Sequence, residues 1–185
     1  MNMDEKLLIN EFIKDRKVGA IASTSNQVTK KMLNKIDFEK ANVFVEYGPG
    51  NGAITKQLLY QMKKDAFLFV FETNEKFIDS LISINDKRLI IINDDAENAQ
   101  QILKNRYKIE KVDYIISTIP FTLFNRNKRK RIIYKSYALL DEKGKFITHQ
   151  YSWLIYYLIK EKFAAANLTT TLLNIPPAFI LVGVK

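Results

Sequence analysis

The chain has 185 residues, of which 47% are hydrophobic and 26% charged, which is typical of one folded domain. It contains no cysteine, which excludes disulfides and thiolate catalysis, and its single histidine argues against a metal site, so we expect no metal. Lysine and arginine number 29 against 20 acids, and the net charge of +9 favours a polyanionic partner, either nucleic acid or anionic lipid, unless it serves only solubility.

The N-terminal part predicts two helices ahead of the main fold. Apolar residues flanked by lysine and arginine form one narrow arc at Leu8, Ile9, Phe12 and Ile13. This arc is typical of a helix that lies on a membrane surface, but it is equally suited to packing on the protein's own sheet. A second helix follows, with N-cap candidates at 23–25 and apolar positions Val28, Met32 and Leu33.

The rest of the chain alternates between strands and helices. Short runs rich in β-branched and aromatic residues predict buried parallel strands at 42–47, 67–72, 88–93, 112–118 and 144–150. Helical spacing between them predicts right-handed crossovers, with helices on both faces of the sheet. Only Pro176 and Pro177 separate the runs 169–175 and 178–184, so these two form an antiparallel pair. We expect a single domain over 1–185, with a helical extension at 1–38 and a core at 42–185.

The stretch VFVEYGPGNGAIT, at 43–55, joins the first strand to a helix through a glycine-rich turn. Its spacing satisfies the dinucleotide pattern, which alone does not decide the cofactor. Glu46 would repel a pyrophosphate and attract an ammonium group. Glu72 ends the second strand where a ribose is held, and Asp95 follows the third strand where an acid could read an adenine amino group. Amino acid, ribose and adenine together describe S-adenosylmethionine.

Four motifs, VEYGPGNG, FET, NDDA and STIPF, resemble those of class I methyltransferases. The resemblance implies an α/β fold with a Rossmann-like, seven-stranded, mostly parallel sheet and an antiparallel last strand. It also implies that Glu46 and 48–52 hold the methionine part of the cofactor, Glu72 the ribose, and Asp95 with Ala96 the adenine. The expected cofactor-binding set is Glu46, Tyr47, Gly48, Pro49, Gly50, Asn51, Gly52, Glu72, Thr73, Asp94, Asp95, Ala96 and Ser117. For Glu72 and Asp95, an N-cap role at a strand exit is the alternative.

The methyl acceptor should face STIPF, at 117–121, where we expect catalytic roles for Thr118, Pro120 and Phe121. The related rRNA adenine dimethylases have asparagine where this chain has Thr118, and a hydroxyl does not reproduce a fixed amide acceptor. The helical region that follows their catalytic domain has no counterpart in this sequence. RNA is therefore the second choice of acceptor. A third hypothesis is a module that binds S-adenosylmethionine (SAM) but has no catalytic activity.

A closer resemblance is to the bacterial phospholipid N-methyltransferases, carried by FIKDRKVGAIASTS, VFVEYGPGNGAIT, STIPF, GKFITHQYS and NIPPAFILV. It implies methylation of the headgroup of phosphatidylethanolamine by a cytoplasmic protein peripheral on the inner face of the membrane. The N-terminal helix would then bind the anionic membrane surface.

An alkyl ammonium must lose its proton before it accepts a methyl group. We expect Tyr151 to take part in this step and place His149 beside the substrate as an alternative base, although an ordinary strand histidine is the more common reading. Arg126, in the basic cluster 125–131, is expected to meet the lipid phosphate; otherwise the cluster is a solvated helix start. The run 153–159 favours a buried helix over an acyl-chain entrance.

Overall fold

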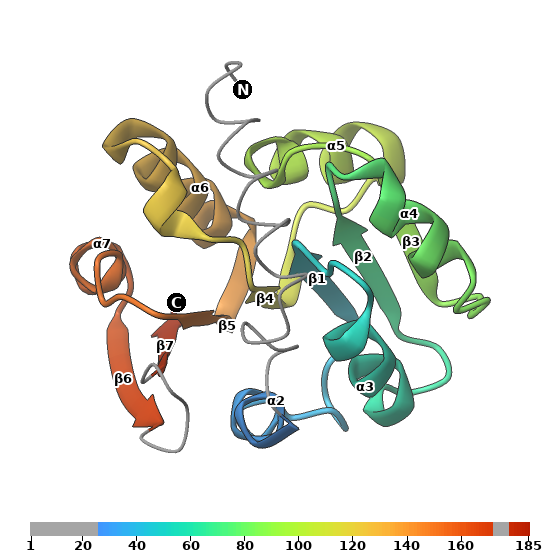
Figure 1. Cartoon of the computed structure of the whole chain (residues 1–185), viewed down its shortest axis with the longest axis horizontal. Coiled ribbons are helices and arrows are strands. Elements are labelled where there is room, and N and C mark those ends of the chain that lie inside the picture. The colour runs from blue at the N-terminus through green and yellow to red at the C-terminus, as the bar shows by residue number, and fades with distance from the viewer. Residues whose placement is uncertain (1–25, 172–177) are drawn as a thin grey trace.

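The computed structural model describes residues 26–171 and 178–185, and a seven-stranded sheet forms its centre (Figure 1). The strands are β1 (Val43–Tyr47), β2 (Phe67–Phe71), β3 (Leu89–Ile92), β4 (Val112–Ser117), β5 (Leu140–Gln150), β6 (Ala165–Thr171) and β7 (Ala178–Val184). Their order across the sheet is β3-β2-β1-β4-β5-β7-β6. β7 runs antiparallel to both of its neighbours, β5 and β6, and the other neighbouring pairs are parallel. This Rossmann-like arrangement confirms the predicted fold class.

Six α-helices surround the sheet among the described residues: α2 (Asn26–Leu33), α3 (Ala53–Gln61), α4 (Glu75–Ile82), α5 (Ala99–Tyr107), α6 (Arg126–Leu139) and α7 (Tyr156–Lys162). Two short 3-10 turns, η1 (Ala96–Asn98) and η2 (Phe121–Leu123), precede α5 and α6. In Figure 1, α5 and α6 lie above the sheet and α2 and α3 below it. Over the described ranges, no helix is both long and apolar enough to span a bilayer.

The core consists of two hydrophobic clusters, one on each face of the sheet, because successive strand residues point to opposite sides. Val45 of β1 packs in the cluster that α5, α6 and α7 cover, whereas Phe44 packs in the cluster that α2 and α3 cover. β1 and β4 lie side by side at the centre, and the order of the strands reverses between them. Ligands of open α/β sheets bind at the carboxyl ends of the strands at such a reversal.

The second predicted N-terminal helix is confirmed as α2, whose Val28, Met32 and Leu33 are buried against the sheet. The predicted helix around Phe12, the N-cap candidates at 23–25 and the turn at 176–177 lie outside the described residues.

Two predicted strand boundaries were wrong. β5 begins at Leu140, because Leu140 pairs with Val112 before a register shift, and the exposed polar residues that follow Leu140 hid this part of the strand. β6 begins at Ala165 instead of 169. It is an edge strand with mostly exposed side chains, so no apolar alternation marks it in the sequence.

Candidate active site

The glycine-rich turn between β1 and α3 has three residues in the left-handed region. Gly48, Gly50 and Gly52 have φ values of +69°, +56° and +79°. A Cβ atom at Gly50 would meet no atom of the described residues within 4 Å, whereas one at Gly48 would lie 2.7 Å from Cγ2 of Ile119. The chain therefore turns tightly beside β4 and leaves open space next to Gly50. Pro49 is buried in this turn and Asn51 is exposed.

Glu46 of β1 is fully buried beneath this turn. Its Oε2 accepts a hydrogen bond of 2.7 Å from the Thr55 hydroxyl, and its Oε1 has no hydrogen-bond partner among the described residues. Burial raises the pKa of Glu46 to about 8; the bond from Thr55 opposes this shift and the charge of Glu72 adds to it. The carboxyl is thus neutral at pH 7, and a cation beside Oε1 would favour its ionised form.

Glu72, at the end of β2, binds three backbone N–H groups. Its Oε2 accepts from Gly50 at 3.1 Å, and its Oε1 accepts from Thr73 and Asn74 at 2.8 and 2.9 Å. The N-cap of α4 is Asn74, so Glu72 does not cap that helix itself. The carboxylate fixes the glycine-rich turn of β1 against the end of β2.

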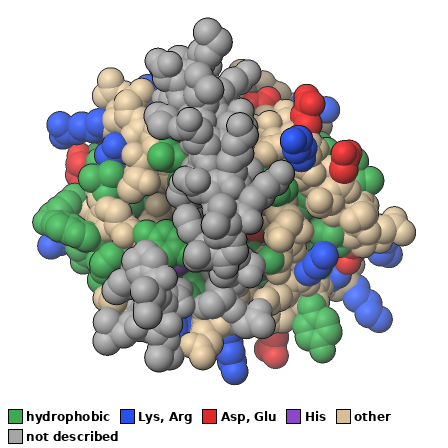
Figure 2. Space-filling view, in the orientation of Figure 1, with side chains coloured by type: hydrophobic (Ala, Val, Ile, Leu, Met, Phe, Trp, Pro, Cys, Tyr) green, Lys and Arg blue, Asp and Glu red, His purple; other side chains and the backbone are tan. Residues whose placement is uncertain are grey.

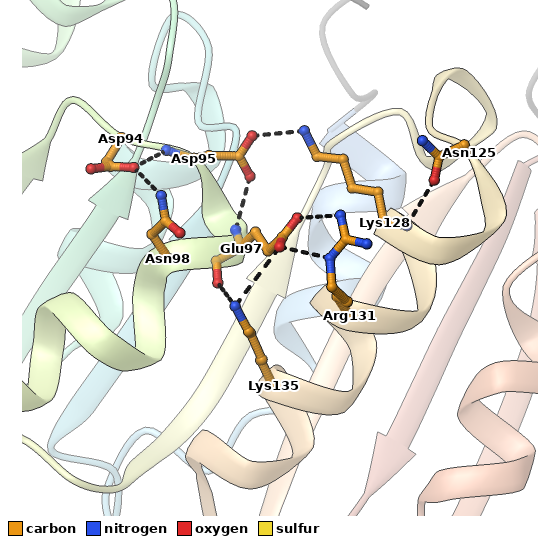
Figure 3. Close-up of polar contacts among 8 residues, drawn as sticks. All are labelled: Asp94, Asp95, Glu97, Asn98, Asn125, Lys128, Arg131 and Lys135. Carbon is orange, nitrogen blue, oxygen red and sulfur yellow. Dashed lines mark hydrogen bonds and ion pairs between the residues drawn. The ribbon is translucent and has the colours of Figure 1, made fainter. Parts of the chain in front are cut away.

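The segment after β3 brings Asp94, Asp95 and Ala96 next to α6 (Figure 3). Asp94 accepts from the Asp95 N–H and from the Asn98 side-chain amide. Oδ1 of Asp95 accepts from the Glu97 N–H, which makes Asp95 the N-cap of η1, as the alternative reading expected. Its Oδ2 lies 2.8 Å from Nζ of Lys128.

Three cations of α6 hold this segment. Besides Lys128, Arg131 donates to both carboxylate oxygens of Glu97, and Lys135 donates to the Glu97 backbone carbonyl. Lys128 was not singled out in the sequence. The sequence does contain a pattern that could have identified Lys128. Lys128 stands four residues before the buried Ile132 and so lies on the same, inward-facing side of α6.

On the acceptor side, β4 ends at Ser117, whose buried hydroxyl has no hydrogen-bond partner within the described residues. The Thr118 hydroxyl donates to the Gly48 carbonyl at 2.7 Å, and its N–H donates to the Tyr47 carbonyl at 3.0 Å. The loop after β4 is therefore tied to the glycine-rich turn. Pro120 occupies the N-cap position of η2.

Two expected site residues direct their rings into the core. Tyr47 is 1% exposed, and its hydroxyl accepts a bond from Ser136 of α6. Phe121 is also 1% exposed and packs edge-on against Phe124 and Phe146. Both side chains therefore pack in the hydrophobic core and do not line the site.

The remaining candidates lie around the end of β5. The rings of His149 and Tyr151 are 5.0 Å apart; His149 is buried and Tyr151 is 40% exposed. Gln150, which the sequence did not suggest, donates to the Ile119 carbonyl at 3.0 Å and so joins the end of β5 to the loop after β4. Arg126 begins α6 and is exposed. Among the described residues, no group of acids and histidine could hold a metal ion.

Comparison with known proteins identifies this arrangement. The family model for ribosomal RNA adenine dimethylase matches residues 15–125. The chain belongs to this family. It is a SAM-dependent N-methyltransferase, and its cofactor is S-adenosylmethionine.

Among curated relatives, an ornithine lipid N-methyltransferase of Singulisphaera acidiphila is 26% identical to this chain. The match covers 97% of this chain and 96% of the relative. A ribosomal RNA small subunit methyltransferase A of Malacoplasma penetrans is 29% identical over 70% of this chain, which spans only 45% of that relative's length. The N-methyltransferase NodS of Bradyrhizobium japonicum, in complex with S-adenosyl-l-homocysteine, shares the fold, with a TM-score of 0.67, 10% identity and coverage of 86% of each chain.

Proposed function

We propose that this methyltransferase transfers methyl groups from S-adenosylmethionine to the amine of a lipid headgroup at a membrane surface, with phosphatidylethanolamine as the first candidate acceptor. The observation that carries the proposal is the collinear match to an ornithine lipid N-methyltransferase, which covers nearly all of both chains. The net charge of +9 suits an enzyme whose acceptor lies in an anionic bilayer.

The proposed cofactor site begins at the glycine-rich turn. Glu46 offers the ammonium group a buried oxygen that has no hydrogen-bond partner in the described ranges, and the space beside Gly50 leaves room for the methionine part. In this proposal the ribose hydroxyls bind Glu72, while Asp95 and Ala96 face the adenine. Thr73, Asp94 and Ser117 line the same edge of the sheet, since they stand at the ends of β2, β3 and β4. These residues fit the cofactor, because the carboxyl group of Glu46 can bind its ammonium group and that of Glu72 can bind its ribose hydroxyls.

S-adenosylmethionine supplies an already activated methyl group, so the protein has to position the amine and remove its proton. We assign positioning to the loop 118–121, with the Thr118 oxygen as hydrogen-bond acceptor for the amine. A headgroup amine with a pKa like that of lysine costs about 4 to 5 kcal/mol to deprotonate at pH 7. Tyr151 and His149 are the proposed pair for this step, because their rings are in contact at the open end of β5. Arg126, at the exposed start of α6, is proposed to meet the lipid phosphate.

A second candidate function is methylation of ribosomal RNA, which the family match favours. Both candidates can be tested in one experiment. Labelled S-adenosylmethionine is offered with detergent micelles of phosphatidylethanolamine, micelles of ornithine lipid, or undermethylated ribosomal RNA. We expect label in the lipid extract, and the preferred lipid defines the acceptor. Label in the RNA alone would overturn the lipid proposal, and binding of cofactor without any transfer would indicate a catalytically silent module.

A further inference from the structure

Four large apolar side chains are exposed next to one another between the end of β5 and the first turn of α7. We call Tyr151, Trp153, Leu154 and Tyr157 the aromatic patch; their exposed fractions are 40%, 51%, 43% and 62%. The sequence favoured a buried helix here, and only part of the run is buried. Ile155 and Ile159 are fully buried and anchor the segment to the core. The patch is therefore held outward by a fixed backbone.

The patch differs from the other exposed apolar side chains of the described residues. Trp153 and Tyr157 contact each other with ring centroids 5.5 Å apart. Tyr60 of α3 and Ile82 of α4 are exposed singly on other helices. Figure 2 shows hydrophobic side chains gathered at the left edge of the molecule, where α7 lies in Figure 1. Contiguous exposed apolar surface marks an interaction site, whereas scattered apolar residues are normal.

Cations follow the patch along α7 and lie on the neighbouring helix α6. Lys160 and Lys162 follow it on α7, and Lys130 of α6 and Lys162 both approach the ring of Tyr134, at 5.0 and 5.2 Å. A hollow beside them on α6 is lined by Asn127, Lys130, Arg131, Tyr134 and Lys135. Two of these cations, Arg131 and Lys135, are bound to Glu97, and Glu161 accepts a hydrogen bond from the Tyr134 hydroxyl. Tryptophan and tyrosine flanked by lysine favour the headgroup level of a bilayer, and lysine favours anionic lipids.

The patch also adjoins the proposed acceptor site. Tyr151 directly follows Gln150, which binds the Ile119 carbonyl of the loop after β4. β4 and β5 are parallel neighbours, and the loop after β4 and the patch after β5 therefore lie at the same end of the sheet. A membrane in contact with the patch would thus present its headgroups to Thr118.

We propose that the aromatic patch is the surface by which this enzyme docks on an anionic bilayer, with the rings at headgroup level and the neighbouring lysines on anionic lipids. This inference rests on the proposed lipid acceptor, since docking at this edge has a purpose only if the acceptor is in the bilayer.

Trp153 is the only tryptophan of the chain, so the fluorescence of the unmodified protein tests the proposal. Vesicles of phosphatidylethanolamine and phosphatidylglycerol should shift the Trp153 emission to the blue, and brominated acyl chains should quench it. Phosphatidylcholine vesicles or high salt should give a much smaller change, because the lysine attraction is then lost or screened. Emission that stays unchanged while the protein cosediments with anionic vesicles would overturn the proposal, as would a change caused by RNA and not by vesicles.

The double variant Leu154→Ala/Tyr157→Ala keeps the fluorophore and should weaken binding to anionic vesicles by roughly tenfold. Tyr60→Ala, which removes an exposed tyrosine elsewhere, should bind as the unmodified protein does. Equal weakening by both changes, or by neither, would contradict the assignment. Methylation of micellar lipid separates the two proposals. If micellar lipid is methylated but Trp153 does not insert, only the docking proposal fails; if no lipid is methylated in either form, the proposed function fails.

Discussion

Nζ of Lys128 lies 2.8 Å from Oδ2 of Asp95, and only 5% of the lysine side chain is exposed (Figure 3). The pair joins α6 to the segment after β3, and Nζ also lies 4.7 Å from the centre of the Phe124 ring. A lysine held this way fixes the carboxylate that is proposed to read the adenine. It also connects that carboxylate to the helix that follows the acceptor loop.

We predict that Lys128→Met weakens S-adenosylmethionine binding about tenfold, or about 1.4 kcal/mol, because Asp95 loses the partner that orients it. The melting temperature should also fall, since the change leaves the partly buried Asp95 carboxylate without its cation. Calorimetric titration and thermal unfolding measure the two effects. Lys104→Met is the control, because it breaks an exposed ion pair with Glu110, and such pairs contribute little. A Lys128 variant with unchanged cofactor affinity would remove Lys128 from the adenine site.

The protonation of Glu46 predicts a pH-dependent cofactor affinity. Because the pKa of Glu46 is raised to about 8, the carboxyl must lose its proton to pair with the cofactor's ammonium group. Affinity should therefore rise from pH 6 towards about pH 8 and fall again as the ammonium of the free cofactor, with a pKa of about 8, is deprotonated. Titration calorimetry at pH 7 in buffers of different ionisation enthalpy should show proton release on binding. Glu46→Gln should bind the cofactor weakly, and its affinity should not increase between pH 6 and pH 8. An increase that persists in this variant would show that another group releases the proton.

The same shift predicts how the stability of the cofactor-free protein depends on pH. In the unfolded chain Glu46 ionises near its ordinary pKa of 4.5, whereas in the folded protein it keeps its proton up to about 8. Between these values the folded state binds more protons, so this group makes the free energy of unfolding decrease as pH rises. Urea unfolding at pH 5 and pH 7.5 measures the difference. Glu46→Gln should reduce it, and an equal difference in both proteins would show that Glu46 is not the source.

The sequence predicted the sheet well because its strands carry strong signals. The buried parallel strand β2 is a continuous apolar run and β1 is interrupted only by Glu46, while the glycine spacing after β1 marks the turn. The edge strand β6 has no such run, so its start was misplaced. Sequence placed Glu46, Glu72 and Asp95 at strand ends but could not show which are neutral or already bonded. Those properties depend on contacts with residues far along the chain, as between Asp95 and Lys128.

Replacing a glycine of the glycine-rich turn by alanine should have different effects at Gly50 and at Gly48. The methyl group of Gly50→Ala would contact no atom of the described residues, so the change should cost backbone strain of about 1 to 2 kcal/mol while placing that methyl group in the proposed cofactor space. Gly48→Ala carries the same strain and also forces Ile119 to move. We therefore expect Gly50→Ala to lose cofactor affinity with a modest loss of stability, and Gly48→Ala to lose more stability. Thermal unfolding with and without S-adenosylmethionine separates the effects. Undiminished stabilisation of Gly50→Ala by the cofactor would place the ligand elsewhere.

Thr118 is the residue whose role most directly tests the acceptor site. Its hydroxyl donates to the Gly48 carbonyl, which leaves the oxygen lone pairs for an incoming amine. Thr118→Val keeps the shape but removes the oxygen, so we expect kcat to fall roughly tenfold through loss of positioning. Thr118→Ser keeps the oxygen and should retain most of the activity. Steady-state kinetics with the lipid acceptor, combined with direct measurement of cofactor binding, distinguish lost positioning from lost cofactor. If the valine and serine variants are equally active, the hydroxyl does not position the amine, and the bonds that Thr118 makes serve only to join β1 to the loop after β4.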